Sequence, residues 1–137
     1  MCIRDSQEIG QLINIFEGYC ESLYETSMST QEILKERGME SIALYATPFL
    51  MFISSVTAGW LLLQQAVVAS DQLSKIRSKE GLEDLDDSEF IVKNEKALFY
   101  TNKLKITRYF LEAVIPQYHS LLEGGKKQNF DALEINF

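Results

Sequence analysis

The side chains best suited to binding an ion lie in an acidic run from Glu83 to Glu89. Three oxygen-bearing residues of this run and Glu95 beyond it follow the spacing of positions one, three, five and twelve in a calcium-binding loop: Asp84, Asp86, Ser88 and Glu95. Position six is Glu89, where such a loop needs glycine for its turn. A helix N-terminus also favours carboxylates, with Asp87 or Ser88 as its cap. We therefore interpret the run as the start of a helix and not as a calcium site.

Cysteine and histidine offer little catalytic or metal-binding chemistry. Cys2 and Cys20 are the two cysteines, too few for a disulfide framework or a metal site. Cys20 falls in an apolar helical stripe, which predicts a buried and inert thiol. His119 has no cysteine or histidine at ligand spacing, so we expect a surface or packing residue. These patterns predict neither catalytic nor metal-binding residues.

Five cations make the region from residue 93 to residue 108 the most basic part of the chain: Lys93, Lys96, Lys103, Lys105 and Arg108. We interpret them as a solvated face that balances the acidic run. Contact with a phosphate-bearing ligand or a partner is the alternative. The net charge of −7 argues against a nucleic-acid partner, because phosphate binding needs a cationic surface.

No charged residue occurs between Glu40 and Asp71. Large apolar residues recur there at spacings of three and four, which predicts one long helix: Tyr45, Phe49, Phe52, Val56, Trp60, Leu63 and Val67. The other faces of this helix are also apolar, so it belongs inside a bundle or a bilayer. A span of hydrocarbon needs about 20 residues, and this stretch is long enough. Its internal polar residues and acidic flanks favour a buried helix, covered by its neighbours, in a cytoplasmic protein without a membrane partner.

The flanking segments also have helical periodicity. We predict helices over residues 7–24 and 31–37 with a polar break at 26–30, ended by Gly38. Pro48 either kinks the central helix or lies in its first turn. A last helix runs from about Ser88 to Glu123, is kinked by Pro116 and ends at Gly124-Gly125. A short tail follows with apolar anchors at its end: Phe130, Leu133 and Phe137.

The prediction is therefore an all-α domain, a three- to four-helix up-down bundle around a long central hydrophobic helix. Residues 1–6 look like a short non-native leader from translated adaptor sequence. The domain is expected over residues 7–137, as a fragment of a longer protein.

Several segments resemble one family in order and spacing. Residues 45–52 read YATPFLMF and are followed by AGWLLL at 58–63, KALFY at 96–100 and VIP at 114–116. In this order they resemble the extra C-terminal helical domain of the acyl-CoA dehydrogenases, in the branch that includes methylmercaptopropionyl-CoA dehydrogenase. The resemblance covers roughly Gln7 to Phe137.

The resemblance implies an FAD-dependent oxidoreductase of fatty acid metabolism, in which a glutamate removes the α-proton of an acyl-CoA and the flavin accepts the β-hydride. It places those parts outside this segment, and Glu112 is not nominated as the base. We expect no catalytic, cofactor or metal residues here and an inactive isolated segment. The implied partners are the catalytic domains of the same polypeptide and further copies in a homo-oligomer. Five aromatic residues are candidates for packing at such an interface: Trp60, Phe99, Tyr100, Tyr109 and Phe110. The alternative function is a free-standing helical protein-interaction module.

Overall fold

The computed structural model describes residues 3–79, 90–91, 94–126 and 131–134. Nearly all of these residues are helical, and none of them lies in a β-strand, which confirms the all-α class. The elements in chain order are α1 (Ile3–Arg37), α2 (Met39–Ala43), α3 (Ala46–Lys79), α5 (Glu95–Tyr109), the π-helix η1 (Phe110–Val114), α6 (Ile115–Lys126) and the 3₁₀-helix η2 (Asp131–Glu134).

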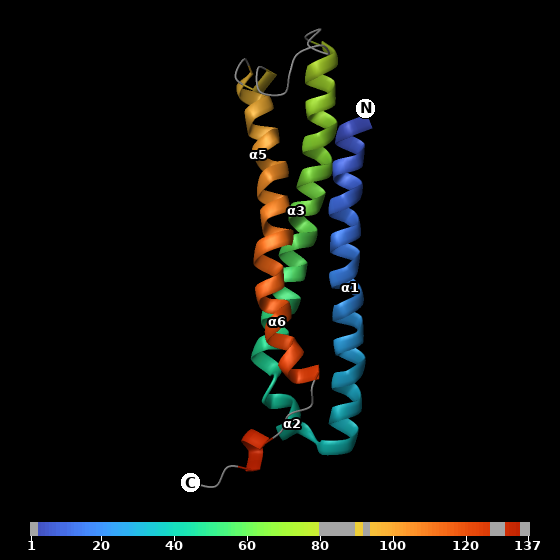
Figure 1. Ribbon diagram of the computed structural model, residues 1–137, viewed down its shortest axis with the longest axis vertical. Coiled ribbons are helices and arrows are strands. Elements are labelled where there is room, and N and C mark those ends of the chain that lie inside the picture. Colours follow the sequence, from blue (N-terminus) through green and yellow to red (C-terminus); the bar gives the residue numbers. More distant parts are fainter. Residues whose placement is uncertain (1–2, 80–89, 92–93, 127–130, 135–137) are drawn as a thin grey trace.

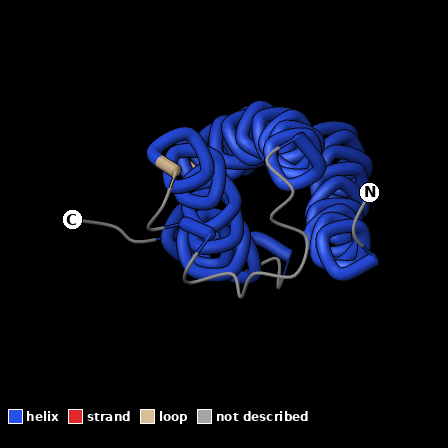
Figure 2. The backbone as a smooth tube through the Cα atoms, turned by 90° about the horizontal axis from the view of Figure 1, so that it is seen from above, coloured by secondary structure: helices blue, strands red, loops and turns tan. Residues whose placement is uncertain are grey.

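Helix α3 lies between two helical neighbours and contacts both (Figure 1). Helix α1 packs along one side of α3, and the continuous stack α5–η1–α6 packs along the other. Seen along the long axis, the helices lie side by side in an arc (Figure 2). Helix α1 also contacts η1. Helix α1 and the stack α5–η1–α6 therefore meet near the middle of that stack.

Helix α1 is a single helix of 35 residues, so the predicted break at residues 26–30 was wrong. The hydroxyl groups in this segment donate to backbone carbonyls one turn earlier: Thr26 to Ser22 at 2.7 Å and Thr30 to Thr26 at 2.8 Å. These bonds satisfy the polar side chains within the helix, so the helix continues through them. Gly38 follows with φ 83°, and the predicted end of the helix at this glycine is confirmed.

The start of α3 explains the position of Pro48. After the short helix α2 and a turn at residues 44–45, α3 begins at Ala46, so Pro48 is in its first turn. A residue at this position has no intrahelical acceptor for its N–H, so proline removes no backbone bond. Of the two alternatives predicted for Pro48, the first-turn position is the one observed.

Helix α5 begins later than predicted. Asn94 has an extended backbone, with φ −139° and ψ 111°, and caps the helix. Its Oδ1 accepts hydrogen bonds from the N–H groups of Lys96 (3.0 Å) and Ala97 (3.1 Å). A helix continuous from Ser88 was therefore wrong. The predicted caps Asp87 and Ser88, and the first three calcium-spaced residues, lie outside the described residues.

One face of α3 supplies the core, and the opposite face is open to solvent. Phe52, Val56, Leu63 and Leu73 are buried against α1 and the last helical stack. In contrast, Leu50 and Val68 are 62% and 58% exposed, so the expectation of a central helix covered on all sides was wrong. In the described part, α3 is the one helix long and apolar enough to cross a membrane, because a window of 18 residues in it has a mean hydropathy of 1.6. Core helices of soluble proteins also pass this test.

The C-terminal end of the chain differs from prediction in two details. Helix α6 continues to Lys126, past the glycine pair expected to end it. Leu133, an expected anchor of the tail, is 46% exposed in η2, which lies apart from the long helices (Figure 1). Docking by Leu133 was therefore wrong, and Phe130 and Phe137 lie outside the described residues.

Candidate functional site

A groove follows the seam between α3 and the stack α5–η1–α6. Its upper hollow, of about 470 Å³, is lined by Leu61, Gln64, Gln65, Val68, Ala69, Phe99, Tyr100 and Lys103. Its lower hollow, of about 420 Å³, is lined by Thr47, Leu50, Met51, Ser54, Ser55, Phe110, Val114 and Tyr118. The α3 residues of both hollows recur at spacings of three and four, so they share one helix face. We call the two hollows together the seam groove.

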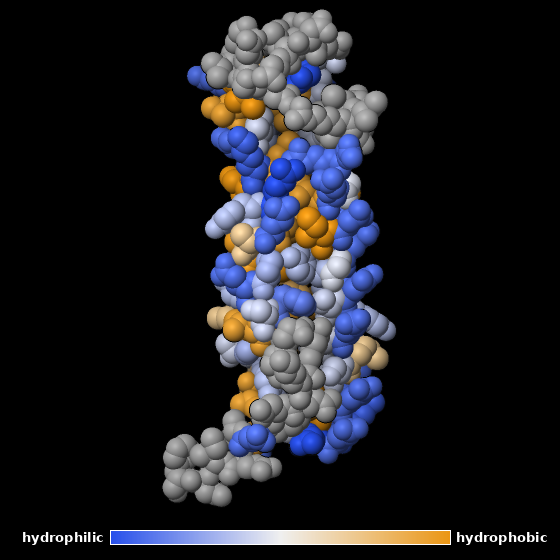
Figure 3. Space-filling model, in the orientation of Figure 1, coloured by the Kyte–Doolittle hydropathy of each residue, from blue (hydrophilic) through white to orange (hydrophobic). Residues whose placement is uncertain are grey.

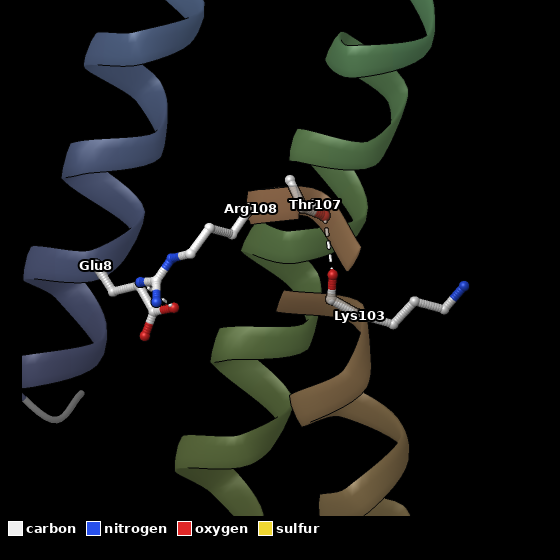
Figure 4. Close-up of polar contacts among 4 residues, drawn as sticks. All are labelled: Glu8, Lys103, Thr107 and Arg108. Atoms are coloured by element: carbon white, nitrogen blue, oxygen red, sulfur yellow. Dashed lines mark hydrogen bonds and ion pairs between the residues drawn. The ribbon is translucent and has the colours of Figure 1, made fainter. Parts of the chain in front are cut away.

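The two helices of the seam are held together by a buried threonine. Thr107 is fully buried on α5, and its hydroxyl donates to the backbone oxygen of Leu62 on α3 at 3.0 Å. The same hydroxyl lies 2.9 Å from the backbone oxygen of Lys103 (Figure 4). A hydroxyl that bonds across two helices fixes their relative position, because moving either helix leaves a buried polar group unsatisfied.

Lys103 brings a positive charge to the upper hollow. Its Nζ donates to Oε1 of Gln65 at 3.0 Å and lies 5.4 Å from the centre of the Phe99 ring. No carboxylate within the described residues forms an ion pair with it. The ammonium group is therefore held by a neutral amide and an aromatic face, and its charge is not neutralised by an acid.

The five predicted basic residues do not form one surface. Arg108 extends toward α1, where its Nη2 pairs with Oε1 of Glu8 at 2.7 Å, and Lys103 extends to the opposite side (Figure 4). Lys96 and Lys105 are exposed on α5. The expectation of one concentrated basic face was therefore wrong for the described members, and Lys93 lies outside the described residues. Spacings of seven and three residues place Lys96 with Lys103 and Lys105 with Arg108, so the helix carries its described cations on two faces.

Pro116 produces the π-helical segment next to the lower hollow. In η1 the N–H of Ile115 bonds to the oxygen of Phe110, five residues earlier. Pro116 has no N–H to continue this pattern to Leu111. The Leu111 oxygen instead accepts a hydrogen bond from the hydroxyl of Tyr19 on α1 at 2.8 Å. The Leu111 carbonyl is thus satisfied by a side chain from another helix.

Gly59 permits the close approach of α3 to the last helical stack. A Cβ at this position would lie 2.8 Å from Cδ1 of Ile115 and 3.2 Å from Cδ2 of Leu111. Both neighbours are fully buried. Glycine is needed here because the space that a larger side chain would occupy is already filled.

The five candidate interface aromatics do not gather at one place. Phe99 and Tyr100 line the upper hollow and pack edge to face, with ring centres 5.3 Å apart, and Phe110 lines the lower hollow. Trp60 and Tyr109 line neither hollow and are 49% and 66% exposed. Their role at an interface stays a prediction. The sequence does not predict the groove directly. Leu61, Gln65 and Val68, at spacings of four and three, are the pattern that indicates its α3 wall.

Neither Cys20 nor His119 lies in the surroundings typical of a reactive side chain. Cys20 is exposed, so its predicted burial was wrong; partial desolvation and the nearby Glu17 carboxylate raise the pKa of its thiol. His119 is half-buried and packs against the rings of Phe52 and Tyr19, with centres 5.3 Å and 6.2 Å away, which confirms a packing residue.

The described residues show no cluster of metal ligands. Among them, no group of three or more His, Cys, Asp or Glu side chains could hold a metal ion, and Glu112 is exposed. An FAD pyrophosphate needs converging donors, but Arg108 and Lys103 diverge and the hollows are mostly apolar. The seam groove therefore does not present converging donors for an FAD pyrophosphate.

Comparison with known proteins identifies the family. Residues 2–135 match the family model described as Acetyl-CoA dehydrogenase C-terminal like. The chain belongs to this family. A curated relative of this acyl-CoA dehydrogenase C-terminal domain is the butyryl-CoA dehydrogenase of Syntrophomonas wolfei subsp. wolfei (strain DSM 2245B / Goettingen), 25% identical over 114 residues, which cover 83% of this chain. The matched residues span 16% of that protein's length. No solved structure matches the C-terminal domain.

Proposed function

We propose that this chain is the C-terminal helical domain of an FAD-dependent acyl-CoA dehydrogenase and docks on the catalytic part of the same enzyme. The family match over residues 2–135 carries this proposal. The parent enzyme would dehydrogenate an acyl-CoA between its α and β carbons. Residues 7–137 would contribute structure and contacts, and the flavin and the catalytic base would belong to the rest of the polypeptide.

The described geometry suits a docking role better than a chemical one. The seam groove is open and largely apolar, and the cations near it diverge. Packing of α3 between α1 and α5–α6 supports an up-down bundle as the architecture of the domain. A bundle of this kind acts by burying area against another domain or subunit.

The narrower parts of the proposal rest on the sequence resemblance. We propose the branch that includes methylmercaptopropionyl-CoA dehydrogenase, a cytoplasmic location, a homo-oligomeric parent enzyme and an acyl-CoA substrate bound by its catalytic part. Neither a nucleic acid nor a membrane is proposed as a partner.

The test begins with the source DNA upstream of Gln7. The longer reading frame and the 137-residue chain are expressed in parallel, and each purified protein is assayed for flavin absorbance and for butyryl-CoA-dependent reduction of a dye. We expect flavin and activity in the longer protein and neither in the chain alone. A stop codon directly upstream, with no flavin-enzyme sequence in the frame, would contradict the proposal and favour a free-standing interaction module.

The docking role has a separate readout. Removal of residues 7–137 from the longer protein should leave the flavin spectrum in place and lower the temperature at which flavin is released, because the catalytic part loses a packed neighbour. A deletion variant with an unchanged release temperature would contradict docking, even if the enzyme itself is confirmed.

A further inference from the structure

The seam groove leaves apolar side chains from both of its walls open to solvent. Leu50 and Leu61 of α3 are 62% and 49% exposed, and Phe99 of α5 is 57% exposed. Figure 3 shows apolar side chains at the surface at several heights along the molecule. Single exposed apolar residues are ordinary, but a row along one seam is typical of a surface that another protein segment covers.

The dimensions of the groove suit a helix. Its α3 wall runs from Thr47 to Val68, which at the rise of an α-helix is about 30 Å. The lower hollow opens beside residues 47–55 and the upper hollow beside residues 61–69, so an elongated occupant could reach both. An amphipathic helix of about 20 residues could lay its apolar face along the seam, as in helix-in-groove recognition.

Lys103 indicates which charge a helix bound in the groove should carry. Lys103 is a half-buried residue whose ammonium lies at the surface, beside apolar side chains, and is held by Gln65 and the Phe99 ring. A helix that covers this lysine removes it from water, and an unpaired charge is then costly. A carboxylate on the incoming helix would neutralise it and form a charge-assisted hydrogen bond.

We propose that the seam groove seats an amphipathic α-helix that places an acidic side chain opposite Lys103. This inference rests on the proposed function for the origin of the helix: it belongs to the polypeptide outside these 137 residues, since the chain spans 16% of its butyryl-CoA dehydrogenase relative. A second copy of the chain suits the groove less well. A two-fold contact centred on Lys103 would bring two ammonium groups together.

The charge preference of the groove can be tested with the chain and two synthetic peptides. Both are 20-residue amphipathic helices with the same leucine stripe, and they differ only in one central residue, glutamate or lysine. We expect the chain to bind the glutamate peptide about ten-fold more tightly, measured by fluorescence anisotropy. Lys103→Glu should reverse this preference, and Lys103→Met should abolish it.

Lys105→Glu is the matched control, because it makes the same charge change at an exposed α5 residue outside both hollows. It should keep the preference of the parent chain, and circular dichroism checks that each variant is folded. Equal affinity for the two peptides in the unaltered chain would overturn the proposal. So would a preference that Lys103→Glu leaves unchanged, or binding to phosphatidylcholine vesicles without peptide discrimination. A longer reading frame without flavin would instead refute the proposed function and leave the peptide result standing.

Discussion

Thr107, Tyr19 and Gly59 act where two helices meet. Thr107 and Tyr19 donate to backbone oxygens of neighbouring helices at 3.0 Å and 2.8 Å. Gly59 leaves room for Ile115 from α6. A buried hydroxyl and a missing side chain both depend on exact neighbours, so a change at these positions affects the packing between helices more than the helices themselves.

Gly59→Val should lower the free energy of unfolding by about 2 kcal/mol, because it adds atoms where the packing is already full. Chemical denaturation followed by circular dichroism measures this. Gly10→Ala is the matched control in helix α1, where a Cβ would meet no atom within 4 Å. It should raise stability by about 0.5–1 kcal/mol through helix propensity. A Gly59→Val chain as stable as the parent would contradict the close approach at this glycine.

Tyr19 should make stability depend on alkaline pH. Burial, and then the Glu112 carboxylate, raise the pKa of its hydroxyl above the ordinary value of about 10. The folded state therefore holds this proton more tightly than the unfolded chain, and the resulting stability is present below about pH 10 and is lost as pH rises through the folded pKa.

Denaturation curves recorded between about pH 9 and pH 11 check this sign. The parent chain should lose more stability over that range than Tyr19→Phe, which has no proton to release. Tyr24→Phe, at an exposed tyrosine of the same helix, should follow the parent curve. Parallel curves for the parent and Tyr19→Phe would show that this hydroxyl does not contribute.

At the scale of whole elements, proline and hydroxyl residues occur inside helices without ending them. Thr26 and Thr30 bond back to carbonyls within α1, and Pro48 lies in the first turn of α3. Pro116 changes the hydrogen-bond pattern of the last stack to a π-helical turn and leaves a carbonyl for α1. The lengths of the helices therefore depend on which polar groups find partners.

The link between Pro116 and Tyr19 predicts a thermodynamic coupling. Tyr19→Phe alone should cost about 1 kcal/mol of unfolding free energy, the usual value for one lost hydrogen bond. Pro116→Ala restores an N–H that can supply the helix carbonyls, so Tyr19→Phe should cost less in that background. A double-mutant cycle measured by denaturation gives the difference. Strictly additive effects would mean that the tyrosine does not compensate for the proline.

For the whole molecule, the decisive feature is that α3 has packed neighbours on two sides and solvent on a third. Its buried face joins α1 and the last stack into one core, and Glu8 pairs with Arg108 across the outer helices. The exposed face carries large apolar residues along the seam groove. Under the proposed function, this face is available to the rest of the enzyme.

Two substitutions on this face should reduce the exposed apolar surface with little change in stability. Leu61→Gln combined with Val68→Gln should reduce binding of a fluorescent hydrophobic dye and change the unfolding free energy by less than about 1 kcal/mol, since both side chains are about half exposed. Leu63→Gln, at a buried position of the same helix, is the control and should cost several times as much. Unchanged dye binding in the double variant would locate the accessible apolar surface elsewhere.

The sequence by itself determined the helical class, the long apolar helix, the end of α1 at Gly38 and the family. Helical periodicity and special backbone residues are local properties, and the order of several motifs is directly visible along the chain. It did not reveal that residues 26–30 stay helical or that Cys20 is exposed, because both depend on which groups find partners or cover in the folded chain.

Only the tertiary structure decided which face of α3 is covered and which groups the cations of α5 contact. A helix that is apolar on most sides has no unique buried face until its neighbours are placed, so periodicity predicted too much burial. Helical spacing already separates Lys103 from Arg108, which are five residues apart, but only the packed neighbours decide what each one contacts. Their partners, Gln65 on α3 and Glu8 on α1, are far away along the chain and lie on opposite sides of α5 because the helices pack that way.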